Sequence, residues 1–250
     1  MEALDPKDTK RCTLEEVQGV PLFPDLVEQW DSLWNFKARP DDLLICTYPK
    51  AGTTWMQEIV DMIQQGGDVQ KCARAPIYER IPFIEMNAKD VAVSYFHFHR
   101  MGKLFPEPGN WDEFLEKFIA GKVAWGSWSD HILNWWKAKD HHPILYLFYE
   151  DMKEATREIR KVAHFLGVEL PEPILNRIVQ HTQFESMKAN PMCNLSTMPP
   201  ELVDPNMPPF MRKGIVGDWK EHFSEAQRKQ LDDICTQLLA GTGLTFRTEL

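Results

Sequence analysis

The order of apolar and polar positions divides this chain of 250 residues into helices and short strands. Residues 43–47 and 144–148 are short apolar runs, which are typical of strands buried in a parallel sheet. Apolar residues recur at helical spacing in a longer series of segments, at 24–34, 56–63, 87–99, 111–120, 127–139, 151–166, 173–181 and 224–239. Residues 198–209 are rich in proline and lack periodicity, so they predict a long loop.

Helices that alternate with apolar strands predict an α/β fold, a P-loop-like three-layer domain in which helices flank a central parallel sheet. Only two strands stand out, whereas sheets usually contain about four to six strands. We therefore expect a sheet that is depleted of strands. The length of the chain favours a single domain that spans residues 1–250.

Composition narrows the classes of function that fit the chain. The formal net charge of −9 argues against a broad nucleic-acid surface, which requires a basic face. No apolar run approaches the roughly 18 residues of a membrane span, and the first residues lack the features of a signal peptide, so we expect a cytoplasmic protein. The five cysteines are odd in number and widely spaced, which favours free thiols over disulfides or a zinc site.

The sequence Y-P-K-A-G-T-T-W at 48–55 follows the first predicted strand and opens a helix. Backbone N–H groups at a helix N-terminus favour a phosphate, to which Lys50 adds a charge and Gly52 a close backbone approach. The hydroxyls of Thr53 and Thr54 supply further donors. The segment lacks the first glycine and the Gly-Lys pair of a Walker A motif, which disfavours a P-loop kinase or hydrolase. The alternative interpretation is an ordinary strand-to-helix turn with a surface lysine.

Further motifs make a family resemblance specific. They are N-A-K-D-V-A-V-S-Y-F-H-F at 87–98, Y-L-F-Y-E-D-M-K at 146–153, P-F-M-R-K-G at 209–214 and G-D-W-K at 217–220. Together with the 48–55 segment they resemble the cytosolic sulfotransferases, most closely the branch that acts on phenols and other small aromatics. The resemblance runs nearly end to end. It implies transfer of a sulfonate from 3′-phosphoadenosine 5′-phosphosulfate to an acceptor hydroxyl, without a metal.

The resemblance also implies a donor site. Lys50 would be catalytic, because it would stabilise charge on the oxygen that leaves with the donor's phosphate. The 50–54 loop would hold the 5′-phosphosulfate, Ser94 and the 212–214 run the 3′-phosphate, and aromatic residues the adenine. The implied residues are Lys50, Ala51, Gly52, Thr53, Thr54, Trp55, Ser94, Tyr149, Thr182, Phe184, Met187, Arg212, Lys213 and Gly214. From residue type alone, these would be an ordinary helix serine, a solvated basic pair and aromatic core.

Another set of residues resembles the lining of an acceptor pocket. These residues are Leu26, Tyr78, Phe83, Phe98, Leu195 and Leu202. Such a lining suits a flat aromatic ring whose hydroxyl faces the donor, although the same composition is found in any core.

One departure from the family lies at the junction of Met86 and Asn87. Family members carry there a stretch of about 30 to 45 residues, the size of one βαβ unit, which includes a strand with Lys-Thr-His-Leu-Pro. Met86 stands where an arginine would grip the 3′-phosphate, and the histidine of that strand is the family's general base. General-base assistance is worth about 10²- to 10⁴-fold, so we expect impaired turnover. His97 and His99, on the helix of Ser94, are candidate substitutes, but the family keeps a histidine at the position of His97 alongside its general base, which argues against such a role.

Two hypotheses therefore remain open at the level of sequence. In the first, the chain is a sulfotransferase with impaired turnover. In the second, it is an inactive, splice-type variant that binds nucleotide weakly or pairs with intact subunits. The family's dimer pattern K-x-x-x-T-V-x-x-x-E is degenerate here, since Glu225 replaces its valine, so a homodimer is expected only weakly from the sequence.

Overall fold

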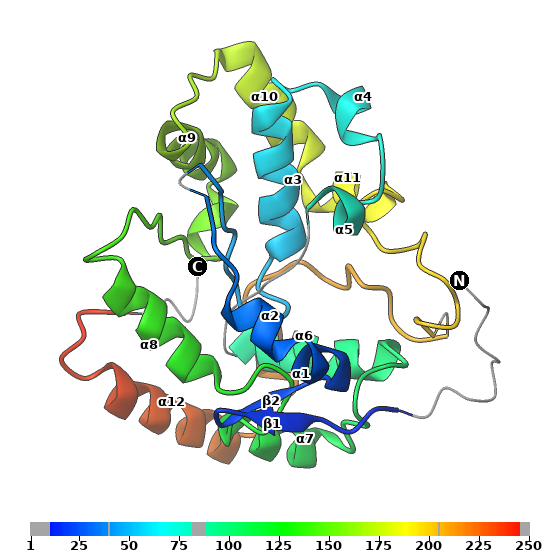
Figure 1. The fold of residues 1–250 in the computed structure, drawn as a ribbon, viewed down its shortest axis with the longest axis vertical. Coiled ribbons are helices and arrows are strands. Elements are labelled where there is room, and N and C mark those ends of the chain that lie inside the picture. Colours follow the sequence, from blue (N-terminus) through cyan, green and yellow to red (C-terminus); the bar gives the residue numbers. More distant parts are fainter. Residues whose placement is uncertain (1–10, 40, 82–88, 205, 246–250) are drawn as a thin grey trace.

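A computed structural model describes residues 11–39, 41–81, 89–204 and 206–245 (Figure 1). In these residues the chain is largely helical, and its only named strands form a hairpin, β1 (Glu15–Val17) with β2 (Val20–Leu22). The strands are antiparallel, with Glu15 opposite Leu22. Gln18 and Gly19 link them, both with positive φ, at 52° and 82°. Two successive positive φ angles match the twist of a tight hairpin turn, and glycine adopts one of them without strain.

Several predicted helices form within a few residues of their expected bounds. They are α3 (Thr53–Gln64), α7 (Trp111–Ile119), α8 (Trp128–Ala138), α10 (Glu172–His181) and α12 (Glu225–Leu239). α6 (Lys89–Met101) corresponds to the helix predicted at 87–99, whose first residues lie outside the described part of the chain. The helix predicted at 24–34 is divided into α1 (Pro24–Glu28) and α2 (Trp30–Trp34). The one predicted at 151–166 is a 3₁₀ turn, η1 (Asp151–Lys153), followed by α9 (Ala155–Phe165).

The pattern did not predict the shorter helices. They are α4 (Val69–Cys72), α5 (Ile77–Arg80), α11 (Phe184–Ala189) and the 3₁₀ helix η2 (Asp218–Glu221). Each spans at most two turns, so too few apolar positions repeat to give a helical period. Residues 198–204 and 206–209 contain no helix or named strand, in agreement with the predicted loop. None of the described helices combines the length and the apolar content that a membrane span requires.

The prediction of a central parallel sheet is wrong for the described residues. Segments 43–47 and 144–148 are not strands, and no ladder pairs them there. Both segments line an apolar cleft of about 150 Å³, together with side chains of α3 and α9. Ile45, Leu145 and Leu147 pack against the core of that part of the molecule. The apolar runs therefore marked burial correctly, but a strand also needs a neighbouring strand at about 4.8 Å, which a run of residues cannot guarantee.

The buried apolar residues of the described chain form two clusters. One gathers residues of α3, α9 and α10, and the other gathers residues of α6, α7 and α8 around Tyr48. In Figure 1 the first group of helices lies at one end of the molecule and the second at the other, beside α12 and the hairpin. The Tyr48 hydroxyl donates to the Gly126 carbonyl oxygen at 2.7 Å, which satisfies its polar group inside the second cluster.

The first cluster contains a buried ion-pair network. Glu58 and Asp61 of α3 both contact the Arg80 guanidinium, Glu58 at 2.7 Å, and Glu58 also lies 2.8 Å from His181 Nε2. Burial alone would raise the pKa of Glu58, but the hydrogen bond with His181 and the charge of Arg80 hold it below its ordinary value. The network joins α3 to α5 and α10. Since these charges are out of water, their mutual pairing is required for the helices to pack as they do.

Candidate functional site

A cavity of about 880 Å³ lies where the N-terminus of α3 meets α6, α9 and the 210–218 segment. All but one of the residues predicted for donor binding line it: Lys50, Ala51, Gly52, Thr53, Thr54, Trp55, Ser94, Tyr149, Thr182, Phe184, Arg212, Lys213 and Gly214. The exception is Met187, which is buried in α11 and does not line the cavity. Residues that are far apart in the sequence thus share one cavity, which we call the donor cavity.

The turn before α3 forms one wall of the donor cavity. Lys50 and Gly52 have positive φ angles of 75° and 101°. Gly52 is the N-cap and supplies no side chain to the first N–H groups of α3, so no side-chain cap competes with a ligand for them. Thr53 Oγ1 lies 2.7 Å from Thr47 Oγ1, whereas Thr54 Oγ1 is buried without a hydrogen-bond partner. An unpaired buried hydroxyl at a helix N-terminus is well suited to an anion.

Lys50 extends between two aromatic rings. Its Nζ lies 3.3 Å from the centroid of the Phe210 ring and 4.6 Å from that of Phe98. Aromatic faces attract a cation without neutralising its charge. Lys50 also lines a second, much smaller cavity of about 10 Å³, together with Ser94 and His97. The ammonium group is therefore positioned at the boundary of the two cavities.

The 212–218 segment carries two cations that are held by one carboxylate. Asp218, which is buried, contacts the Arg212 guanidinium and lies 2.5 Å from Lys213 Nζ. Burial opposes ionisation of Asp218, but its hydrogen bonds with Arg212 and Lys213 outweigh that effect and hold its pKa below the ordinary value. Arg212 Nε is buried and lacks a hydrogen-bond partner. This donor remains for an anionic ligand.

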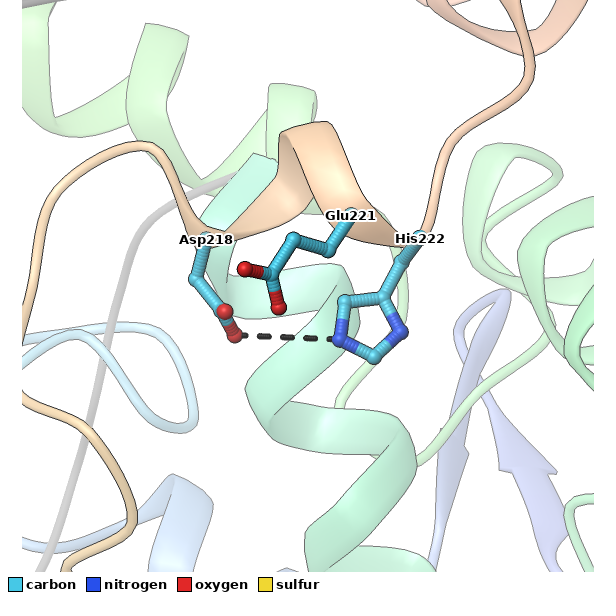
Figure 2. Close-up of side chains that lie close together, drawn as sticks. All are labelled: Asp218, Glu221 and His222. Carbon is cyan, nitrogen blue, oxygen red and sulfur yellow. Dashed lines mark ion pairs between the residues drawn. The ribbon is translucent and has the colours of Figure 1, made fainter.

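Figure 2 shows Asp218 with Glu221 and His222, all from η2 or its end. Their ligand atoms lie within 4.8 Å of one another, a spacing that a metal ion could bridge. Lys213 Nζ, however, lies 2.5 Å from an oxygen of each of the two carboxylates. Because the lysine already supplies the positive charge between them, we assign no metal to this cluster.

Asp90 of α6 joins that helix to the 212–218 segment. Its carboxylate accepts hydrogen bonds from the backbone N–H groups of Gly217 at 2.9 Å and Trp219 at 3.0 Å. Ser94 lies one turn further along α6 and also lines the donor cavity. The position of Ser94 relative to Arg212 and Lys213 is thus fixed by two hydrogen bonds.

Aromatic rings form another wall of the donor cavity. The rings of Trp55 and Tyr149 meet edge to face with centroids 5.7 Å apart. Phe184 lies against the backbone of Gly214, where a Cβ would come within 2.2 Å of its ring, and Gly214 has a φ of 62°. Only glycine fits at this position, because any side chain would meet the ring and the backbone angle is left-handed.

The acceptor residues predicted from the resemblance do not share one cavity in the described part of the chain. None of the five described candidates lines the donor cavity, and only Phe98 lines the small cavity beside Lys50. Tyr78 Oη lies 3.2 Å from Thr197 Oγ1, and Leu195 is buried with a φ of 61°. Leu26 in α1 and Leu202 in a loop are both half-buried. Phe83 lies outside the described residues, as does the junction of Met86 with Asn87.

His97, the candidate substitute base, has two buried ring nitrogens without hydrogen-bond partners. It lines the small cavity beside Lys50 and Ser94. Burial, followed by the charge of Arg212, lowers its pKa to about 4. The imidazole is therefore neutral at pH 7, but with this pKa it is a weak general base.

Basic residues of η1 and α9 also line the donor cavity, although the sequence did not lead us to them. They are Lys153, Arg157 and Arg160, which repeat at helical spacing. Arg157 lies 2.5 Å from Glu154, and Arg160 contacts Glu172, so these two charges are paired. The spacing of the three cations was the available signal, but a charged helical face is usually a solvated one.

Comparisons with known proteins identify the fold and the family of this chain. The sulfotransferase domain family matches residues 40–88 and 86–243. A crystal structure of mouse sulfotransferase SULT7A1 complexed with PAP aligns with a TM-score of 0.73 and 29% identity, over 91% of this chain and 94% of that one. A retinol dehydratase structure in complex with androsterone and inactive cofactor PAP gives a TM-score of 0.82 at 23% identity, over 92% and 90%. The chain therefore has the sulfotransferase fold.

Sulfotransferase 1C2 of Rattus norvegicus is 46% identical over 295 aligned positions, which cover 99% of this chain and all of the relative. The chain belongs to the cytosolic sulfotransferase family, in the sulfotransferase 1 branch that includes 1C2, 1A1 and 1D1. Because the alignment has 295 positions and the chain only 250 residues, at least 45 positions of the relative have no counterpart here. The family match is also divided at residues 86–88, the place of the predicted gap.

Proposed function

We propose that this chain transfers a sulfonate from 3′-phosphoadenosine 5′-phosphosulfate to the hydroxyl of a phenol or another small aromatic or alcohol, in the cytoplasm and without a metal. The observation that carries the proposal is the donor cavity. It brings together a helix N-terminus, Lys50, five further cationic side chains and several aromatic rings. Two of its polar atoms, Thr54 Oγ1 and Arg212 Nε, are buried and unpaired. We also propose that residues 1–250 form a single domain.

The residues present fit such a donor. The 50–54 turn and Thr54 Oγ1 would hold the 5′-phosphosulfate, while Ser94 and the 212–214 turn would hold the 3′-phosphate. Trp55 and Phe184 would enclose the adenine, with Tyr149 at its edge. Thr182 would act from the cavity wall and Met187 from the layer behind it.

Lys50 has the chemistry of the catalytic residue. In sulfonyl transfer, charge builds up on the oxygen that leaves, and a fixed cation in a partly dry site stabilises that charge more than it stabilises the ground state. The Lys50 ammonium would leave the Phe210 ring to reach this oxygen. The acceptor would enter from the side of Phe98, where the small cavity meets Lys50.

Calorimetric titration with adenosine 3′,5′-bisphosphate tests donor binding directly, and incubation with labelled donor and a small phenol tests turnover. A saturating excess of about 100 times Kd should also stabilise the native chain by about 2.7 kcal/mol, which raises Tm by several degrees. Lys50→Met should abolish measurable turnover while leaving a cooperative melting transition. Absence of binding and of turnover in the unaltered chain would contradict the proposal.

A second candidate function is nucleotide binding without catalysis, alone or beside intact subunits. Two observations favour it: the family positions without counterpart in this chain, and the lack of a cavity that the described acceptor candidates share. The same experiment separates the candidates, because binding without turnover supports this one. A homodimer stays a prediction. Ser224 and Glu225 stand in the family's dimer pattern. Here they begin α12, and Ser224 forms a capping box with Gln227.

A further inference from the structure

Lys153 is the one cation of the η1 and α9 face that no described carboxylate holds in an ion pair. Its Nζ donates to the carbonyl oxygen of Gly214 at 2.6 Å and lies 3.4 Å from Tyr149 Oη. The same ammonium lies 4.9 Å from the centroid of the Tyr149 ring and 5.5 Å from that of Trp55. Lys153 therefore connects the aromatic wall of the donor cavity to the 212–214 turn.

The carbonyl that Lys153 holds ends the run of Arg212 and Lys213. Gly214 cannot move toward Phe184, because its backbone already lies against that ring. At its other end the segment is held by the hydrogen bonds from Gly217 and Trp219 to Asp90. The position of Arg212 and Lys213 is thus fixed by two anchors, Lys153 of η1 and Asp90 of α6.

Loss of either anchor would let the turn move while its own ion pairs stay intact. Arg212 and Lys213 would remain bound to Asp218, which belongs to the same segment and would move with them. Lys153 and Asp90 therefore set where these cations lie relative to the rest of the cavity. A contact of this kind acts on ligand affinity through geometry, since a bidentate grip depends on the position of its donors.

We propose that Lys153 is a positioning residue for the 3′-phosphate of the donor: its hydrogen bond to the Gly214 carbonyl places Arg212 and Lys213 to grip that phosphate. The inference rests on the proposed function and names a residue that acts within the same cavity. It predicts that Lys153 matters for nucleotides with a 3′-phosphate and hardly at all for nucleotides without one.

The test compares the binding of adenosine 3′,5′-bisphosphate and adenosine 5′-monophosphate by calorimetry, using the full chain. In Lys153→Met we expect affinity for the bisphosphate to fall about tenfold and affinity for the monophosphate to change less than about twofold. Lys153→Arg, which keeps a charged donor, should retain affinity for the bisphosphate within about threefold. Lys153→Gln offers a second neutral variant that still donates a hydrogen bond, and its loss should be smaller than that of Lys153→Met.

Lys103→Met is the matched control. Lys103 Nζ also donates to a backbone carbonyl, that of Pro200 at 2.7 Å, but Lys103 does not line the donor cavity. It should change neither affinity. Equal losses for both nucleotides in Lys153→Met, or no loss, would overturn the inference alone. Failure of the unaltered chain to bind the bisphosphate would overturn the proposed function and the inference with it.

Discussion

The donor cavity and the segment that leads into it, residues 33–39 and 41–47, differ in how well the described chain covers their apolar side chains. In the donor cavity, turns, ion pairs and ring contacts place residues from five parts of the sequence together. In the leading segment, large apolar side chains face solvent, with Phe36 70% and Leu44 60% exposed. Exposed apolar groups of this size usually mark a surface that is covered in another context.

This difference shows which contacts form without the family segment that this chain lacks. Asp90 and Lys153 act over a few hydrogen bonds between segments that the chain retains, and Asp218 acts over ion pairs within one such segment. Residues 43–47 and 144–148 have the composition of strands but need further strands beside them. A gap of at least 45 family positions can therefore leave a ligand cavity assembled while it removes the partners of a sheet.

The largest expected effect comes from restoring the gap. Insertion of the corresponding segment of rat sulfotransferase 1C2 between Met86 and Asn87 should raise turnover of a small phenol by about 10²- to 10⁴-fold, because it returns a general base. Affinity for adenosine 3′,5′-bisphosphate should rise much less, since most of the donor cavity already exists. Equal turnover before and after insertion would show that the shortened chain is not impaired.

Removal of the cation that joins Glu58 and Asp61 should have the next largest effect. Arg80→Met leaves Glu58 and Asp61 buried with fewer partners, so we expect a loss of about 3 kcal/mol in the free energy of unfolding, measured with urea. His181 and Arg74 still pair with these carboxylates and limit the loss. In Arg160→Met, which removes an exposed pair with Glu172, the change should stay below about 1 kcal/mol.

The pH dependence of Arg80→Met follows from the same carboxylates. In the unaltered chain the pKa values of Glu58 and Asp61 lie below their ordinary values of 4.5 and 3.8. Their contribution to stability is therefore present above those values and is lost as pH falls through the lower, folded-state values. In the variant, burial without Arg80 favours the protonated forms. The difference in stability should be largest near pH 7 and shrink below about pH 5; a constant difference would exclude this origin.

A smaller effect is expected inside the donor cavity. Gly214→Ala places a Cβ against the Phe184 ring at a left-handed backbone angle, so affinity for adenosine 3′,5′-bisphosphate should fall about tenfold. Gly167→Ala is the matched control, because Gly167 has a φ of 69° but open space around its Cβ position. Gly167→Ala therefore introduces a similar backbone strain but no steric clash with a neighbouring side chain. Similar losses of affinity in both variants would mean that the contact with Phe184 is unimportant.

The smallest effect should come from the exposed segment. Leu44→Lys should change the free energy of unfolding by less than about 0.5 kcal/mol, since Leu44 is mostly in water. Ile45→Lys should destabilise by about 2 kcal/mol or more, because Ile45 packs against the α3, α9 and α10 cluster. Thermal or urea unfolding measures both. A large effect at Leu44 would show that this side chain is covered in solution.

The sequence predicted the long helices from the spacing of their apolar residues, and local signals also mark the start of two of them. Asn110 and Glu113 form a capping box at the start of α7, and Ser224 forms one at α12. The donor cavity was predicted through family motifs, since it is built from turns with fixed residue types such as Gly52 and Gly214. Those roles stay predictions, although the structure gathers the residues that they require.

Other features depend on distant parts of the chain, so the local pattern of residues did not determine them. The strands predicted at 43–47 and 144–148 did not form, because pairing depends on other strands. The acceptor candidates do not share one cavity for a related reason, since most of them lie on short helices and loops whose placement is tertiary. Asp90 and Lys153 were missed as well, because a single carboxylate or lysine on a helix looks like a solvated charge until its partner is known.

Trp55 gives the donor cavity an optical reporter. Its ring lies edge to face with Tyr149 at one wall, 5.5 Å from the Lys153 ammonium, and its indole N–H is buried. An adenine that stacks there would displace water from the ring and quench its emission. The rate of that quenching, followed after rapid mixing, would distinguish simple association from a slower rearrangement of the 212–214 turn.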